Sequence, residues 1–323
     1  MDTNILLFSK DKNRQQTRAC VIKEKGLNNL SVYFRQNANL SEFKNSESWV
    51  VLSPIEKQIK EKIEQLGTPL KDWDIRINYG IKTGFNEAFI IDGSKRKELI
   101  DEDPKSEEII RPILRGRDIK KYGYDFADLW LINTHNGVKE KDVKRIEIDE
   151  YPSIKKHLDQ YYLQLEKRAD KGDTLYNLRN CAYMEDFSKQ KIIYPNMTKY
   201  LPFVYDNKKF LTNQKCFIIT GKNVEFLTAF FNSSLFKYCF RDNFPELQGG
   251  TRELSKIFLD KIPVIQVSEN INLEYEKFVL KLQELKNQQL PTREIEIEID
   301  KRIFELYSLT EEEKNTIGFV EIQ

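Results

Sequence analysis

The sequence predicts a mixed α+β fold, in which a mixed β-sheet is combined with helices and a helical C-terminal extension. Short β-prone runs, such as residues 75–77 and 127–133, alternate with helical segments from residue 53 onward. Capping boxes mark two helix starts, at Ser53 and at Thr310. Beyond residue 268, apolar residues recur at the spacing of an amphipathic helix.

Composition places the 323-residue chain among globular proteins, since 40% of its residues are apolar and 32% are charged. Its four cysteines form no CxxC pair, which argues against a disulfide framework or a zinc knuckle. With only two histidines, a histidine-based metal site or catalytic triad is not expected. No apolar run approaches the ~20 residues that span a bilayer, and no signal peptide pattern is present, so we expect the cytoplasm.

Charge is distributed unevenly along the chain. Residues 291–323 carry four positive and nine negative side chains, a sum of −5. Because the whole chain carries +1, residues 1–290 carry +6. A basic body with an acidic tail indicates a polyanionic partner for the body.

The first 52 residues are expected to be rich in strands, at residues 4–8, 19–22 and 30–34. The chain begins directly on a strand, which suggests a fragment or one half of a split protein. A helix then starts at Ser53, with Pro54 in its first turn and Glu56 completing the cap, and ends at Gly67. The strand at residues 75–77 leads through a glycine loop into a buried strand at residues 88–91.

The middle of the chain alternates between helices and strands. Residues 95–108 are expected to form a charged helix interrupted at Pro104, and residues 150–168 a tyrosine-rich amphipathic helix. Residues 190–220 contain several β-runs, with a hairpin tip at Asn207 and Lys208. A phenylalanine-rich helix capped by Asn223 follows.

The C-terminal residues are expected to be helical. Four apolar residues form a seam at helical spacing: Tyr275, Phe278, Leu282 and Leu285. The segment REIEIEIDKRIFELY starts with a period of two, which favours a strand, but its isoleucines also fit a longer helical stripe, so we predict a helix. Thr310 and Glu313 cap a last short helix.

No common catalytic motif occurs in the sequence. It lacks a G-x-G turn, a P-loop, HExxH, GxSxG and the Asn-Pro-Pro-aromatic motif of amino methyltransferases. Residues 142–144 match only the last part of the Pro-Asp…(Asp/Glu)-x-Lys nuclease pattern, a match that is common by chance. Glu296, Glu298 and Asp300 suggest a metal site, but on a helix Glu296 and Asp300 share one face, which we interpret as solvated.

The loop GIKTGFNEAF (80–89) combines glycines with a cation, a hydroxyl and an amide. Glycine lets the backbone approach a ligand closely. Lys82 and Thr83 can reach phosphate oxygens, and Asn86 can pair with a base edge, adenine being the usual choice. An ordinary β-turn capped by Asn86 explains the same residues equally well.

A second cationic loop lies in RPILRGRDIKK (111–121). Arg115, Arg117 and Lys120 suit phosphate binding. Asp118 is expected to pair with one of the arginines and to shape the turn.

Two further loops complete the set. Asn213 and Lys215 stand at the start of a strand in TNQKC, and Thr251 and Arg252 follow a glycine pair in LQGGTRE. Several cationic, glycine-bent loops without a catalytic motif fit a module that recognises a DNA groove, with phosphate contacts for position and amides or guanidiniums for specificity.

Five segments in this order resemble the TaqI-like C-terminal specificity domain: GIKTGFNEAFIID (80–92), RPILRGRDIKKY (111–122), FLTNQKCFIIT (210–220), FNSSLFKYCF (231–240) and PVIQV (263–267). This domain is the target-recognition part of type IIG restriction–modification proteins and related adenine-specific DNA methyltransferases. The closing segment IEIDKRIFELYSLTEEEKNTI resembles the helical end of those chains. The resemblance implies a β-rich junction after a methyltransferase-type domain at residues 1–52, a DNA-binding target-recognition domain at 53–267 and a helical extension at 268–323.

The resemblance also implies a role without catalysis. The chain would recognise duplex DNA for a methyltransferase or endonuclease domain or subunit, with S-adenosylmethionine and Mg²⁺ bound only in catalytic domains outside this chain and no contact with membranes. Ten residues are carried over as facing DNA: Lys82, Thr83, Asn86, Arg115, Arg117, Lys120, Asn213, Lys215, Thr251 and Arg252.

Two other functions remain open at this point. In a divergent nuclease or methyltransferase, carboxylates such as Glu87 and Asp118 would converge on a metal. In a protein–protein scaffold, the C-terminal helices would pair with a methyltransferase subunit through the seam at residues 275–285.

Overall fold

The computed structural model describes residues 10, 12, 16–22, 28–41, 51–138 and 142–321. The strand expected at residues 4–8 lies outside these described residues. Within the described ranges, no helix has the length and apolar character needed to cross a membrane.

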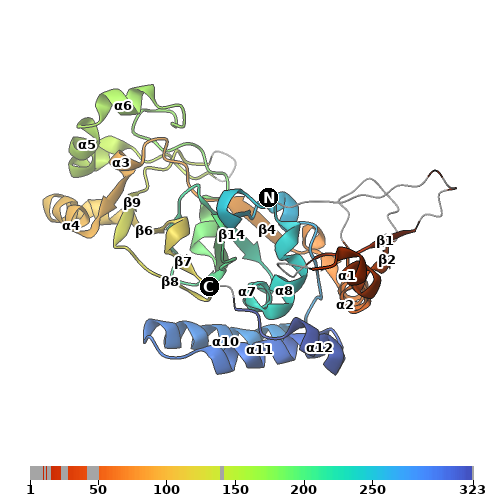
Figure 1. Cartoon of the computed structure of the whole chain (residues 1–323). Coiled ribbons are helices and arrows are strands. Elements are labelled where there is room, and N and C mark those ends of the chain that lie inside the picture. The colour runs from red at the N-terminus through yellow and green to blue at the C-terminus, as the bar shows by residue number, and fades with distance from the viewer. Residues whose placement is uncertain are drawn as a thin grey trace.

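A four-stranded antiparallel sheet lies at the centre of the molecule, in the order β12-β10-β14-β4 (Figure 1). Its strands are β4 (Ile75–Tyr79), β10 (Lys191–Pro195), β12 (Val204–Asp206) and β14 (Cys216–Gly221). Successive side chains of a strand point to opposite faces. Ile192 and Ile219 belong to one hydrophobic cluster, whereas Ile193 and Ile218 belong to the other. The sheet therefore separates two apolar cores.

A second four-stranded sheet, in the order β13-β6-β9-β5, contributes to one of these cores. Its strands are β5 (Ile90–Asp92), β6 (Ile110–Leu114), β9 (Leu129–Ile132) and β13 (Leu211–Thr212), with only the pair of β13 and β6 parallel. Four helices gather at the same end of the molecule (Figure 1): α3 (Asn86–Phe89), α4 (Gly93–Glu102), α5 (Pro152–Asp159) and α6 (Tyr162–Lys167).

The other core is covered by helices. The phenylalanine-rich α7 (Val224–Asn232) and α8 (Ser234–Phe240) pack against the central sheet and are buried almost throughout. A layer of C-terminal helices lies along them (Figure 1), consisting of α10 (Glu269–Asn287), α11 (Arg293–Leu306) and α12 (Glu311–Ile317), and α12 also contacts α2 (Pro54–Leu66).

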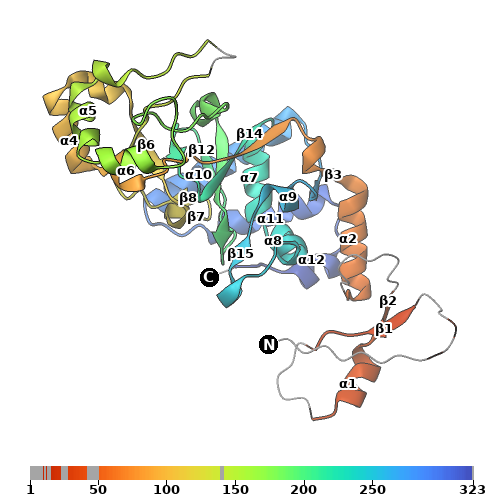
Figure 2. The same ribbon diagram turned by 90° about the horizontal axis from the view of Figure 1, so that it is seen from above.

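The remaining elements are short. They are β1 (Thr17–Ala19), α1 (Leu30–Asn37), β2 (Asn39–Ser41), β3 (Thr68–Pro69), β7 (Ile119–Lys120), β8 (Gly123–Tyr124), β11 (Met197–Thr198), β15 (Arg252–Glu253), α9 (Lys256–Leu259) and β16 (Pro263–Val264). Figure 2 shows α1, β1 and β2 beyond α2, away from the central sheet.

The mixed α+β prediction is confirmed, and so are the elements with strong local signals. Ser53 accepts a hydrogen bond from the backbone of Glu56, whose carboxylate accepts from the backbone of Ser53, and Thr310 and Glu313 form the same box. The segment from residue 293 is a helix, as its longer apolar stripe predicts.

Four predictions of local structure are wrong. The strand expected at residues 19–22 lies earlier, at Thr17–Ala19, and residues 20–22 belong to no strand. Residues 30–34 lie in α1 and not in a strand, because Asn29 accepts from Val32 N and starts a helix. Residues 86–89 form the helical turn α3, so the strand after the glycine loop starts only at Ile90. Residues 150–168 form two helices, α5 and α6, instead of one.

Two turn predictions are also wrong. Asn207 and Lys208 do not close a hairpin, since β12 pairs with β10 whereas β13 pairs with β6 in the other sheet. The buried Asp206 carboxylate turns the chain there by accepting from the backbone of Lys208 at 2.9 Å and of Phe210 at 3.0 Å. Asn223 precedes α7 without capping it, and its side chain donates to the Val267 carbonyl instead.

Two acidic residues of α11, Glu296 and Asp300, are buried, contrary to the solvated face that we expected. Glu296 is 7% exposed and pairs with Lys121. Asp300 is 5% exposed and accepts from the backbone nitrogen and hydroxyl of Ser234. The polar groups of α11 therefore attach this helix to α8 and to the segment before β8.

Lys237 of α8 lies near these carboxylates and is 3% exposed. Burial lowers the pKa of Lys237 to about 7, helped by the charge of Lys121 and opposed by Glu296, Asp300 and Glu321. An unfolded lysine titrates near pH ~10.4. Between about pH 7 and pH 10 the unfolded chain thus binds a proton that the folded chain does not, and stability from this residue rises with pH.

We therefore expect Lys237→Met to raise the free energy of unfolding by about 1–4 kcal/mol near pH ~6, where the folded chain must bury the charge. The gain over the unsubstituted protein should shrink as the pH approaches ~10. Urea denaturation across this pH range measures the difference, with the exposed Lys281→Met as the control. An equal gain in the free energy of unfolding at both ends of the pH range would contradict the lowered pKa of Lys237.

Candidate nucleic-acid interface

Three of the predicted loops lie side by side because backbone hydrogen bonds join them. The loop after β4 is joined to the segment before β14 by Ile81 N, which donates to Thr212 O at 2.7 Å, and by Gly80 N, which donates to Cys216 O at 2.9 Å. Asn213 N donates to Leu114 O at 3.3 Å, which brings in the loop after β6. Residues 80–86, 115–117 and 213–215 thus form one surface, here called the cationic loop surface.

Glycine is required where these loops approach each other most closely. A Cβ atom on Gly80 would lie 1.9 Å from the carbonyl oxygen of Asn213, and one on Gly116 would lie 3.3 Å from Pro195 Cβ and 3.4 Å from Lys215 O. Real Cβ contacts are essentially never shorter than 3.0 Å. The glycines in the two motifs therefore bring backbones together, and this contact explains Gly80 without any ligand.

The cationic loop surface carries three exposed positive charges, one on each loop: Lys82, Arg117 and Lys215. Among the described residues, none accepts a hydrogen bond from these charged groups or forms an ion pair with them. Arg115 and Arg252, by contrast, each have a carboxylate within 4.0 Å, whereas each of these three adjacent loops carries one cation that has none among the described residues. Such a cluster attracts a polyanion.

Other predicted residues on these loops are used inside the protein. Arg115 donates to both carboxylate oxygens of the buried Asp118, at 3.0 and 2.8 Å, and this hydrogen bond raises the pKa of Arg115. The expected Arg–Asp pair is confirmed. Thr83 is buried and its hydroxyl donates to Asn86 Oδ1 at 2.6 Å, which leaves the exposed Asn86 amide nitrogen free to donate.

Asn213 and Lys120 fall between the residues that are used inside the protein and the exposed, unpaired cations. Asn213 is 8% exposed, and its Oδ1 accepts from Lys215 N at 3.1 Å, so it shapes the loop that presents Lys215. Lys120 is exposed and lies 3.4 Å from the Asp125 carboxylate, an ion pair that solvent weakens.

The glycine loop before β15 does not contribute a free cation. Arg252 is 8% exposed, donates to Phe244 O, and its guanidinium lies 2.9 Å from Asp242 and 2.8 Å from Glu246. Thr251, beside it, is half-buried. The backbone nevertheless connects this region to the cationic loop surface, since Asn196 donates to Lys215 O at 2.8 Å and accepts from Leu254 N at 2.7 Å.

Sequence reasoning missed an exposed aromatic residue next to the first loop. Tyr79, the last residue of β4, is 51% exposed, and its ring centroid lies 4.4 Å from that of Phe217. The alternation Ile75, Ile77, Tyr79 signals one face of a strand, but burial of that face ends before Tyr79. A tyrosine here offers a ring to a base or sugar beside Lys82.

The carboxylates of a possible metal site do not converge. Both oxygens of Asp118 are engaged by Arg115, and Glu87 is exposed on α3. In the part of the chain that the structure describes, no group of three or more His, Cys, Asp and Glu side chains could hold a metal ion.

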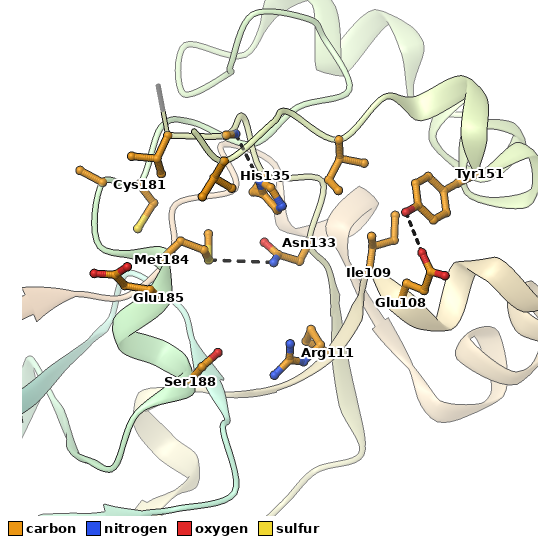
Figure 3. A pocket seen from close by; sticks show the side chains of 15 residues that line it. Glu108, Ile109, Arg111, Asn133, His135, Tyr151, Cys181, Met184, Glu185 and Ser188 are labelled. Carbon is orange, nitrogen blue, oxygen red and sulfur yellow. Dashed lines mark hydrogen bonds between the residues drawn. The ribbon is translucent and has the colours of Figure 1, made fainter. Parts of the chain in front are cut away.

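A cavity of about 410 Å³ lies beyond the opposite end of β6 (Figure 3). Arg111, Asn133, His135 and Ser188 contribute polar groups, and burial lowers the pKa of His135. None of the ten predicted DNA-facing residues lines this cavity.

Comparison with known proteins places the central region of the chain in a family. Residues 111–264 match the model of the TaqI-like C-terminal specificity domain. The chain contains a TaqI-like specificity domain. The resemblance inferred from the sequence is confirmed, and the match includes Arg117 and Lys215, whereas Lys82 precedes it.

Two solved structures resemble the chain beyond the TaqI-like domain. The type IIL restriction–modification enzyme MmeI, solved in complex with DNA, has a TM-score of 0.56 at 11% identity over 85% of this chain and 37% of its own. The type IIG restriction endonuclease BpuSI has a TM-score of 0.47 at 17% identity over 79% of this chain and 34% of its own. The likeness to MmeI shows a common fold, and this chain spans about a third of each enzyme's length.

We expect Gly80→Ala to destabilise the protein because a Cβ atom at this position would overlap the backbone of Asn213. Overpacking of this kind costs about 1–3 kcal/mol, so the urea midpoint should fall. Gly123→Ala is the matched control, since the nearest atom to its Cβ would be the flexible Lys286 side chain at 3.5 Å. Equal midpoints for the two variants would show that the loops are not held together as described.

Proposed function

We propose that this chain is the DNA target-recognition module of a type IIG-like restriction–modification system or adenine-N6 DNA methyltransferase system. It would hold duplex DNA and position a separate catalytic domain on it. The family model supports the proposal, because its members are described as specificity domains. The complex of MmeI with DNA, which shares the fold, adds support by analogy.

The observation that carries the proposal is the set of three unpaired cations on the cationic loop surface, Lys82, Arg117 and Lys215. Cations that replace the counterions of DNA phosphates supply sequence-independent affinity and position the protein on the duplex. Discrimination then needs donors or acceptors at base edges. The exposed amide of Asn86, three residues beyond Thr83, is suited to this task.

The proposal assigns catalysis to other parts of the system. S-adenosylmethionine and Mg²⁺ would be bound by methyltransferase and endonuclease domains or subunits outside this chain, and the flipped adenine would enter a pocket there. Such a system acts on DNA in the cytoplasm, without contact with membranes.

The triple variant Lys82→Ala, Arg117→Ala, Lys215→Ala tests the proposal. Each lost phosphate contact should reduce the slope of log K against log salt by about 0.9, so the triple variant should lose up to ~2.7. Fluorescence anisotropy with a pool of random-sequence duplexes between about 50 and 200 mM salt measures this slope.

The triple variant Lys277→Ala, Lys281→Ala, Lys301→Ala is the charge-matched control, because these residues are exposed on the C-terminal helices. It should retain the slope of the unsubstituted protein. A binding constant that does not change with salt concentration, or an equal loss of slope in both triple variants, would refute the proposed function.

A further inference from the structure

Arg168 lies at the end of α6 with its guanidinium buried beneath the first loop of the cationic loop surface. The residue is 6% exposed. Its Nη1 donates to the carbonyl oxygens of Thr83 and of Asp170, the latter at 3.2 Å. Its Nη2 donates to the carbonyl oxygens of Leu175, at 3.0 Å, and of Asn177. Arg168 therefore connects residue 83 to residues 170–177, more than 80 positions later in the sequence.

A buried guanidinium is costly unless its donors are satisfied. Here backbone carbonyls accept from both Nη atoms, and the centroid of the Phe89 ring lies 4.5 Å from Cζ, whereas the buried Nε has no hydrogen-bond partner among the described residues. Burial lowers the pKa of Arg168 to about 10, with Asp170 acting in the opposite direction, so the group is charged at neutral pH. The planar fork of arginine fits four carbonyls in two directions, which the single ammonium of lysine cannot do.

The contact fixes the loop at the residues between its proposed DNA-facing side chains. Thr83 gives its carbonyl to Arg168 and its hydroxyl to Asn86 Oδ1. Gly84 has φ of +70°, and a Cβ atom there would lie 2.8 Å from Asp170 O. Residues 82–86 are thus held in one conformation against residues 168–170, and Lys82 and Asn86 are exposed.

The segment that carries the other acceptors is itself well fixed. Leu178 N donates to Thr134 O at 2.8 Å, next to the end of β9, and Asn177 donates to Ile146 O at 2.9 Å. Arg168 consequently joins the first loop to a segment that is hydrogen-bonded next to the second sheet.

We propose that Arg168 is the positioning residue of the proposed DNA-recognition loop: without touching DNA, it holds Lys82 and Asn86 in the geometry that binds a phosphate and a base edge. The inference rests on the proposed function. It assigns Arg168 a role in DNA affinity and sequence discrimination that acts through these two residues and not through Lys215.

A double-mutant cycle tests this coupling. Arg168→Lys should weaken binding to random-sequence duplex roughly ten- to a hundredfold, the range typical of residues that orient a contacting group. In the background Lys82→Ala, Asn86→Ala the same substitution should cost little further, because the groups that it misplaces are gone. In the background Lys215→Ala, Arg168→Lys should weaken DNA binding by the same factor as in the otherwise unsubstituted protein. Equal factors in both backgrounds would overturn the inference.

Arg179→Lys is the matched control, since Arg179 lies on the same segment and pairs with Asp170 at the surface. It should bind DNA as the unsubstituted protein does. A loss equal to that of Arg168→Lys would show a general effect of the segment and would overturn the inference.

Hydrogen exchange of the free protein gives a readout that does not depend on DNA. Arg168→Lys should accelerate exchange of the Ile81 and Gly172 amides, which donate to Thr212 O and Asn177 O on the two sides of the contact, while those of β14 keep their protection. If Arg168→Lys fails to fold, Gly84→Ala opens the same contact from the loop side and should give the same pattern. Uniform loss of protection would overturn the inference, whereas absence of DNA binding by the unsubstituted protein would refute only the proposed function.

Discussion

The arrangement of the candidate interface depends on a sheet that is buried on both faces. In β10 and β14, neighbouring residues such as Ile192 and Ile193 belong to opposite cores, so each strand is fixed by packing from both sides. A shift of register by one residue would exchange the two sets of side chains. Because β4 and β14 are adjacent in this sheet, the loop that follows β4 and the loop that precedes β14 must meet at the same edge. The close approach of Gly80 to Asn213 is the local consequence.

Counting charges in the sequence does not locate the interface, because several of the cations in the predicted loops are paired with carboxylates in the fold. Arg115 and Arg252 carry as much charge as Arg117, but the first two lie against carboxylates and the third does not. A paired guanidinium offers a phosphate little net attraction, since its carboxylate partner repels the same anion. The attraction of the cationic loop surface for a polyanion comes from its unpaired groups, Lys82, Arg117 and Lys215. The net charge of +6 on residues 1–290 does not show where these groups lie.

What the sequence predicted correctly was encoded locally. The capping boxes at Ser53 and Thr310 need residues only three positions apart, and the order of the glycine loops is sufficient for the family resemblance. Burial of Glu296 could not be predicted, because its partner Lys121 is 175 positions away. Arg168 was missed for a related reason: its partners are backbone carbonyls, which have no signature in the amino-acid sequence.

Affinity and discrimination place different demands on the cationic loop surface. A long lysine side chain reaches a phosphate from many positions, so Lys215, whose loop Arg168 does not contact, would tolerate some freedom of its loop. An amide that recognises a base must be held with its donor and acceptor in fixed directions. In this structure the Thr83 hydroxyl orients Asn86, and the Thr83 carbonyl is in turn held by Arg168. Fixing this loop before DNA arrives lowers the entropy that ordering it would cost on binding. The buried guanidinium would therefore support the proposed contacts of Asn86 and Lys82 more than that of Lys215.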